Sequence, residues 1–173
     1  MSGSHKGDGV VVRPIAVGDE GMWLRFLGAL SWATRYKRGA RRVDQLTADD
    51  IKRALRPHPG AELAFVAVAG RNGETDIVGV SRGTFLEPGT CEFALVVSDA
   101  WQGCGIGTLL MQALMDEASR QGHGRIVGRV LATNGNMLDF VRGLGFDVQD
   151  DPDNRQVRRV ACLHLPPGRD PQR

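Results

Sequence analysis

Residues 91–115, with the sequence CEFALVVSDAWQGCGIGTLLMQALM, decide the fold of this chain. The apolar run 93–97 predicts a buried strand, and leucines and alanines at helical spacing follow from Leu109 onward. Between them lies the glycine-punctuated loop 102–107. A strand, a glycine loop and a helix start together favour anion binding, because the first N–H groups of a helix lack internal partners and carry partial positive charge. The stretch therefore predicts a site for a phosphate or diphosphate.

The three glycines of this loop narrow the choice of ligand. Gly103, Gly105 and Gly107 remove the Cβ atoms that would hold a phosphate away from the main-chain amides. Glycines alone are a weak signal, because ordinary strand-to-helix turns also use them. Two well-known phosphate loops do not fit. No lysine follows Gly107, as a Walker loop requires, and the G-x-G-x-x-G order of a dinucleotide-binding fold is missing. The pattern that remains is Q-x-x-G-x-G, starting at Gln102.

That pattern resembles the coenzyme A diphosphate loop of the GNAT N-acetyltransferase superfamily. Downstream, Asn134 and the pair Gly145-Phe146 resemble the superfamily's second motif, N-x-x-A…Y…GF, and the similarity covers about residues 62–146. The run E-F-A-L-V-V-x-D-x-W-Q-G-x-G-I-G is also similar to the GNAT domain of bacterial Pat-type protein lysine acetyltransferases. The resemblance implies an α/β (α+β) GNAT fold: a mixed, mostly antiparallel sheet of six to seven strands flanked by about four helices. It also implies acetyl-CoA as co-substrate.

Length and composition limit the possible domain organisation and the possible partners of the chain. With 173 residues, of which 42% are hydrophobic and 24% charged, we expect one domain over residues 10–165, a disordered N-terminus at 1–9 and a flexible tail at 166–173. A net charge of +2 gives no argument for nucleic acid, and no apolar run is long enough for a membrane span. Three cysteines without paired spacing favour a cytoplasmic setting, and the four histidines share no spacing typical of a metal site. Either a monomer or a homodimer is compatible with these features.

The flanking sequence predicts the other elements. Asp19 and Thr47 stand where helix caps are expected, and Asp50 three residues after Thr47 completes a capping box. Arg71-Asn72-Gly73 is typical of a hairpin turn. A helical crossover places the expected strand 126–131 parallel to 91–97. The other expected strands are 10–14, 63–69, 77–85, 146–148 and 157–165, and the other expected helices are 109–120 and 136–144.

Glu92 is the candidate general base. A lysine amine has a pKa of about 10.4, so it must lose a proton before it can attack a thioester. Strand alternation places Glu92, Ala94, Val96 and Ser98 on one face, and an acidic side chain in an apolar strand is costly to bury without a task or a partner. The alternative is that Glu92 lies at the strand edge in water or pairs with an arginine such as Arg82. Many GNAT enzymes carry a catalytic Glu on this strand.

The resemblance also implies a set of coenzyme contacts. Main-chain groups of Val96, Val97 and Ser98 would bind the pantetheine arm, and one N–H there would polarise the thioester carbonyl. Asn134 would hydrogen-bond the pantetheine, although a helix cap before Gly135 explains it equally. The loop residues implied to bind the diphosphate are Gln102, Gly103, Cys104, Gly105, Ile106, Gly107 and Thr108. Neither Cys104 nor Cys91 has a histidine neighbour in sequence, so neither is a candidate nucleophile and direct transfer in a ternary complex is expected.

The chain departs from the family pattern at the general acid. Many GNAT enzymes carry a tyrosine where this chain has Val141, and its only tyrosine is Tyr36. Tyr36 lies in the basic segment 31–42, where aromatic residues alternate with cations. This segment is either a solvated face or a substrate-entry surface to which Tyr36 and Arg38 would contribute.

Three functions remain open from the sequence. The first is acetylation of a protein lysine, the second is acetylation of a small amine, and the third is a non-catalytic sensor that binds acyl-CoA.

Overall fold

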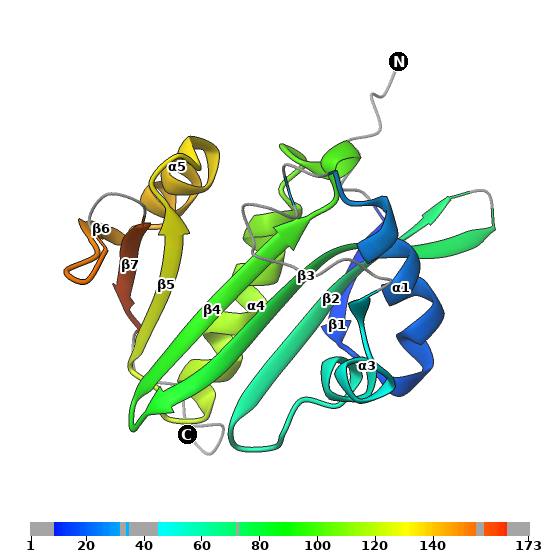
Figure 1. The fold of residues 1–173 in the computed structure, drawn as a ribbon, viewed down its shortest axis with the longest axis horizontal. Coiled ribbons are helices and arrows are strands. Elements are labelled where there is room, and N and C mark those ends of the chain that lie inside the picture. The colour runs from blue at the N-terminus through cyan, green and yellow to red at the C-terminus, as the bar shows by residue number, and fades with distance from the viewer. Residues whose placement is uncertain (1–8, 32–33, 35–44, 72, 155–157, 166–173) are drawn as a thin grey trace.

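The computed structural model describes residues 9–31, 34, 45–71, 73–154 and 158–165. Seven strands form one sheet in the order β1-β2-β3-β4-β5-β7-β6 (Figure 1). The strands are β1 (Val10–Pro14), β2 (Glu62–Arg71), β3 (Glu74–Glu87), β4 (Thr90–Val97), β5 (Arg125–Leu131), β6 (Asp147–Asp150) and β7 (Arg158–His164). The α-helices of the described residues are α1 (Glu20–Ala29), α3 (Ala48–Leu55), α4 (Ile106–Arg120) and α5 (Gly135–Gly143). The predicted α/β architecture, a mixed and mostly antiparallel sheet of six to seven strands flanked by about four helices, is confirmed.

Strands β1 to β4 form an antiparallel meander. In the centre of the meander, Val66 of β2 lies opposite Val80 of β3, and both side chains are fully buried. A long hairpin joins β2 and β3, with Arg71 opposite Glu74 and Gly73 at a φ of 81° in the turn. That φ lies in the left-handed region, which glycine adopts without steric cost. The hairpin is therefore where the sequence predicted it, while the predicted turn residue Asn72 lies outside the described residues.

The sheet changes character between β4 and β5. These two strands are parallel, as the crossover through α4 requires, and they pair only at Thr90, Glu92 and the residue between them. Beyond Glu92 the strands diverge, as Figure 1 shows. On the far side of β5, β7 and β6 continue the sheet in antiparallel pairing. The C-terminal half of β4 consequently has a strand partner on the β3 side alone within the described structure.

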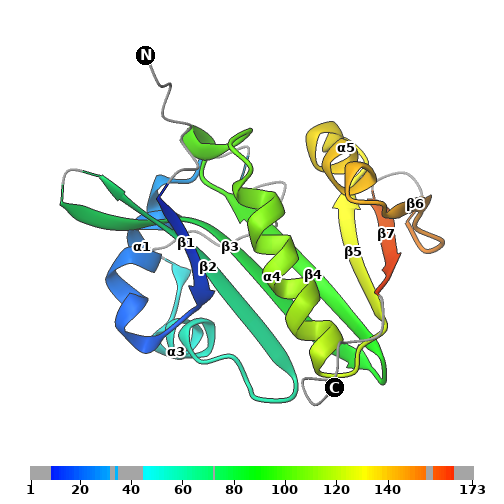
Figure 2. The ribbon, with the colours of Figure 1, turned by 180° about the vertical axis from the view of Figure 1, so that it is seen from behind.

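Helices cover both faces of the sheet. Figures 1 and 2 show α1 and α3 on one face and α4 on the other. Glycines on β3 allow α4 to lie close to the sheet. A Cβ on Gly79 would come within 2.8 Å of Leu110 Cδ1, and a Cβ on Gly83 within 3.0 Å of Leu114 Cδ1. The close contact fixes α4 against the middle of β3 and its N-terminus beside the C-terminal end of β4.

Two local predictions differ from the structure. Asp19 precedes α1, but its carboxylate makes no capping bond to that helix. It forms a two-pronged ion pair with Arg13 at 2.7 Å and accepts a hydrogen bond from the Ala16 N–H, so the hydrogen bond from Arg13 lowers the pKa of Asp19. In addition, α4 begins at Ile106 rather than near Leu109, so the last glycine of the loop is already helical. The capping box of Thr47 and Asp50 is present as predicted.

Candidate active site

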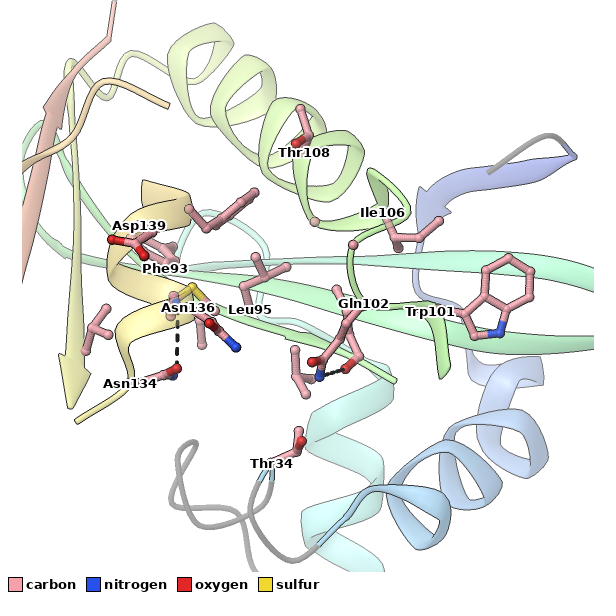
Figure 3. A pocket seen from close by; sticks show the side chains of 18 of the residues that line it. Thr34, Phe93, Leu95, Trp101, Gln102, Ile106, Thr108, Asn134, Asn136 and Asp139 are labelled. Atoms are coloured by element: carbon pink, nitrogen blue, oxygen red, sulfur yellow. Dashed lines mark hydrogen bonds between the residues drawn. The ribbon is translucent and has the colours of Figure 1, made fainter. Parts of the chain in front are cut away.

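A cavity of about 630 Å³ lies where β4 and β5 diverge (Figure 3). Its size is within the range of about 300–1,000 Å³ that is usual for cofactor and ligand sites. Its walls come from β4, the loop before α4, the first turn of α4, β5, α5 and a single residue after α1. The lining residues are Thr34, Phe93, Ala94, Leu95, Val96, Val97, Trp101, Gln102, Gly103, Gly105, Ile106, Gly107, Thr108, Arg129, Val130, Asn134, Asn136, Met137, Asp139 and Phe140.

The loop glycines are required for two different reasons. Gly103 and Gly105 have φ values of 73° and 80°, in the left-handed region, while a Cβ on either would meet nothing within 4 Å. Their role in the protein is therefore conformational. Gly107 lies inside α4, and a Cβ there would come within 3.2 Å of the Phe140 ring. Gly107 thus allows α5 to pack against the first turn of α4, which closes one side of the cavity.

The loop presents a row of main-chain donors to the cavity. Leu109 N–H is the first in this region with an acceptor, the Gly105 carbonyl at 3.2 Å. Within the described part of the chain, no oxygen accepts a hydrogen bond from the amides of residues 103–108. These amides open the 15-residue helix α4, whose macrodipole adds positive potential at the same place. The arrangement is suited to bind a diphosphate.

A side chain ties this loop to the strand before it. Gln102 Nε2 donates to the Val97 carbonyl at 3.1 Å, which Figure 3 shows as a dashed line. The bond spans the turn through the 3-10 helix η3 (Asp99–Trp101). It fixes the start of the loop relative to the end of β4.

The open edge of β4 faces the cavity. Ser98 N–H donates to the Val78 carbonyl of β3 at 2.9 Å. Because successive residues of a strand present their main-chain groups to opposite neighbours, the N–H and C=O groups of Leu95 and Val97 point away from β3 and toward β5. There the strands no longer pair. The N–H and C=O groups of Leu95 and the N–H group of Val97 are thus placed to bind an extended chain. The Val97 carbonyl already accepts a hydrogen bond from Gln102, and the Ser98 N–H is used within the sheet.

Asn134 caps α5 and also lines the cavity. Its Oδ1 accepts a hydrogen bond from Met137 N–H at 3.4 Å (Figure 3). This is the cap function that the sequence offered as an alternative. The side-chain NH₂ group has no protein acceptor in the described structure, so it remains available as a donor toward the cavity.

Glu92 lies beside the cavity rather than in its wall. It lines an adjoining recess of about 190 Å³ together with Glu87 and Arg129, and Arg129 lines both spaces. Glu92 Oε2 is 3.8 Å from Arg129 Nε, and the Glu92 side chain is 34% exposed. The sequence left open that Glu92 pairs with Arg82. In the structure Glu92 pairs with Arg129 instead, and Arg82 Nη2 donates to the Ala54 carbonyl of α3 at 2.5 Å. Glu92 and Ala94 share the sheet face opposite α4, so the carboxylate faces the side of the cavity away from that helix.

Asp99 binds Ser31 and Thr34, of which Thr34 lines the cavity, and these three residues are called the rim here. Its carboxylate accepts hydrogen bonds from Ser31 N–H at 2.9 Å, Ser31 Oγ at 3.1 Å and Thr34 Oγ1 at 2.7 Å. Partial burial alone would raise the pKa of Asp99, but the hydrogen bonds from Thr34 and Ser31 outweigh it and hold the pKa below its usual range. The carboxylate is therefore ionised at neutral pH and binds Ser31 and Thr34 to the turn before the loop.

The two cysteines whose side chains the structure describes, Cys91 and Cys104, do not supply a nucleophile to the cavity. Cys91 is fully buried, and burial together with the nearby Glu92 carboxylate raises the pKa of its thiol to about 11. Such a thiol stays protonated and inert at neutral pH. Cys104 is half-buried in the loop, where its Sγ lies 3.7 Å from the Gln102 carbonyl, and its side chain is not part of the cavity wall.

The structure brings together most of the predicted coenzyme-binding residues. Val96, Val97, Asn134 and six of the seven loop residues lie in the wall, all but Cys104. Ser98 and Glu92 lie outside it, and the predicted substrate residues Tyr36 and Arg38 lie outside the described residues. Val141, where a tyrosine acid was sought, is fully buried in the core.

The described helices include none long and apolar enough to cross a membrane.

Several wall residues were not predicted, because their signals are weak in the sequence. Leu95 is one of several apolar residues in a strand, and only the divergence of β5 exposes its main chain. Arg129 alternates with apolar residues on β5, so its position facing Glu92 follows from the parallel register of these strands. Phe140 fits the apolar spacing of a short helix and gives no sign that it packs on Gly107.

Comparisons with known proteins agree with this geometry. Residues 26–146 match the model of the acetyltransferase (GNAT) family. The chain is 33% identical over 155 residues to the acetyltransferase PA5475 of Pseudomonas aeruginosa, a match that covers 88% of this chain and 83% of that protein.

Solved structures show the same fold. The GNAT domain of S. lividans PAT superposes with a TM-score of 0.77 at 24% identity, covering 89% of each chain. The ribosomal-protein-S18-alanine N-acetyltransferase of Escherichia coli superposes with a TM-score of 0.63 at 15% identity, covering 93% of this chain and 97% of that one. At these identities the superpositions establish the fold alone.

Proposed function

The chain belongs to the GNAT acetyltransferase family, whose members use acetyl-CoA as co-substrate, and from that premise we propose that it acetylates the side-chain amine of a protein lysine. The proposal rests on one observation: the amide row, the open edge of β4 and Glu92 follow one another along a single site. The row of free amides at residues 103–108 leads along the open edge of β4 to the point where β5 rejoins it, beside Glu92. We assign this catalytic unit to residues 10–165 and place it in the cytoplasm, where an acetyl-CoA-dependent enzyme meets its co-substrate.

The proposed binding mode follows the walls of the cavity. The amides of the loop and the first turn of α4 hold the diphosphate. The pantetheine arm lies between the diverging strands, with main-chain bonds to Leu95 and Val97 and a bond from the Asn134 NH₂ group. This places the thioester near Phe93 and Ala94, at the narrow end of the gap. Arg129 and Val130 of β5 then form the opposite wall.

The proposed reaction is direct acyl transfer. The lysine amine reaches the thioester from the sheet face that carries Glu92 and Ala94, and a new N–C bond forms as the C–S bond breaks. A main-chain N–H of β4 donates to the developing oxyanion. Because Glu92 lies one step outside the wall, the amine proton passes to its carboxylate through a water molecule. The leaving thiolate takes its proton from solvent, since the position of the family's tyrosine is occupied by the buried Val141.

The shape of the acceptor side favours a protein over a small amine. The recess beside Glu92 has a volume of about 190 Å³, below the range of about 300–1,000 Å³ of sites that enclose a small ligand. Ala94 is exposed and Glu92 is one-third exposed, so this face is open to a large partner. A narrow recess on an open surface can hold one long side chain while the rest of the acceptor stays outside.

The test is a competition between acceptor classes. Purified protein and labelled acetyl-CoA are incubated with a bacterial lysate and, separately, with a panel of polyamines, amino sugars, arylalkylamines and free lysine. Label in protein bands, with mass spectrometry placing it on lysine side chains, supports the proposal. Turnover of a panel amine with no protein label would assign the enzyme to small amines instead. Coenzyme A binding with no transfer to either class would indicate a sensor.

Glu92→Gln tests the role of the base in the same assay. We expect a loss of about 10²–10⁴-fold in the rate of transfer, with coenzyme A affinity unchanged. Glu87→Gln is the matched control, because Glu87 is a second glutamate of the same recess but lies at the end of β3 and not on β4. An unchanged rate in Glu92→Gln would remove Glu92 from the mechanism.

A further inference from the structure

The bonds at Asp99 connect two parts of the site that are far apart in sequence. Ser31 and Thr34 follow α1, and Asp99 follows β4, 65 to 68 positions later. Three donors converge on one carboxylate, and Thr34 is held further by its own N–H, which donates to Ser31 Oγ at 3.2 Å. Hydrogen bonds to a charged acceptor are shorter and stronger than neutral ones. Ser31 and Thr34 are therefore fixed to the turn that follows β4.

One end of this connection lines the cavity, and the other leads along the chain into its loop. Thr34 lines the cavity directly (Figure 3). Asp99 opens η3, and the amide row begins four residues later at Gly103. Two bonds run along this short path, from Trp101 N–H to the Ser98 carbonyl at 2.9 Å and from Gln102 Nε2 to the Val97 carbonyl at 3.1 Å. A ligand that binds the loop thus contacts a unit to which Thr34 is already attached.

We propose that Asp99 is a positioning residue that holds Thr34 at the mouth of the cavity and links the binding of coenzyme A at the loop to the position of this rim. The inference rests on the proposed function, because it takes the loop as the diphosphate site. As a consequence, coenzyme A that is bound at the loop stabilises the rim, and the acceptor enters past this rim. By linkage, a change that loosens the rim weakens coenzyme A binding by the same factor.

A second carboxylate, that of Asp76 on β3, binds α1 and provides the comparison. Asp76 Oδ1 accepts bonds from Arg25 Nε at 3.0 Å and Arg25 Nη2 at 2.8 Å, which joins α1 to the start of β3. Like Asp99, it is a long-range contact to α1 or its end, but neither Asp76 nor Arg25 lines the cavity. An effect confined to Asp99 therefore reports on the cavity and not on the general attachment of α1.

The Ser31 amide gives a direct measurement, because its N–H donates to Asp99 Oδ2. Amide hydrogen exchange is followed by NMR in the full chain with and without saturating coenzyme A, and coenzyme A affinity is measured by calorimetry. In the wild type we expect coenzyme A to slow exchange at Ser31 by about five-fold or more. In Asp99→Asn we expect this slowing to disappear and the affinity to fall by the same factor. Asp76→Asn should behave as the wild type.

Substitutions of Thr34 test whether its hydrogen bond, and not the size of its side chain, carries the effect at the rim. Thr34→Val keeps the shape of the side chain but removes the donor, so the effect of coenzyme A on Ser31 should be reduced. Thr34→Ser restores the hydroxyl and should restore the effect. If coenzyme A binds the wild type but leaves Ser31 exchange unchanged, or slows it equally in Asp99→Asn, the inference is overturned while the proposed function stands. If coenzyme A does not bind the wild type, the proposed function fails and the inference fails with it.

Discussion

Replacing Gly105 by alanine tests whether the loop conformation creates the diphosphate site. Gly105 is the N-cap of α4 with a φ of 80°, and the space around its missing Cβ is open to 4 Å. The substitution therefore introduces no clash with the rest of the protein. It does introduce the steric cost of a left-handed alanine, which is about 1–2 kcal/mol.

That free energy must appear in one of two measurements. If the loop of Gly105→Ala keeps its conformation, the free energy of unfolding falls by about 1–2 kcal/mol. If the loop relaxes, the protein stays stable but coenzyme A must restore the left-handed state on binding. Since about 1.4 kcal/mol corresponds to a tenfold change, its affinity then falls by about 5-fold to 30-fold. A mixture of the two outcomes should still give a sum close to this range.

The assays are urea unfolding without ligand and calorimetric titration with coenzyme A. Gly122→Ala is the matched control, because Gly122 also has a positive φ, of 90°, with open space around it, but lies past the far end of α4. It should lose a similar unfolding free energy and bind coenzyme A as the wild type does. Full stability together with full affinity in Gly105→Ala would refute the reasoning, because the predicted cost would then be missing from both measurements.

Three further substitutions or treatments test the packing and the charges of the fold. Gly128→Ala should lower the free energy of unfolding by about 1–3 kcal/mol in urea, because the Phe93 ring occupies the place of the new Cβ. Asp19→Asn should lower it by about 1–3 kcal/mol at pH 7, by breaking the pair with Arg13. Since that pair lowers the pKa of Asp19 below 3.8, the difference from the wild type should persist above about pH 4 and vanish as the pH falls further through the lowered pKa. Cys91, whose thiol pKa is raised to about 11, should resist iodoacetamide at pH 8 in the native protein and react in urea, as followed by peptide mass spectrometry.

The local features of the site could be predicted from the sequence because they depend on residues close together in the chain. The order of strand, loop and helix follows from the apolar run before Gln102, the glycines and the leucines after them. The parallel placement of β5 follows from the length of the crossover through α4. The capping box at Thr47 needed only one residue three positions later. In each case one short segment contains both the cause and its structural effect.

The remaining features depend on contacts between distant segments. The pairing of β4 and β5 stops at Glu92, and no residue in either strand marks that point, so the open main chain of Leu95 could not be predicted. Asp99 lies beside the predicted loop, but its partners Ser31 and Thr34 come from another part of the chain. Asp19 illustrates the competition directly. Asp19 is a good cap residue, but its carboxylate pairs with Arg13 on the first strand, because the charge of the arginine attracts it more strongly than a helix N–H does.

A crystal structure with coenzyme A bound tests the central claim most directly. We expect the diphosphate oxygens within hydrogen-bond distance of the amides of residues 103–108, and the pantetheine arm between β4 and β5 along Leu95 and Val97. A diphosphate held elsewhere on the protein, with these amides bound to water, would contradict the account.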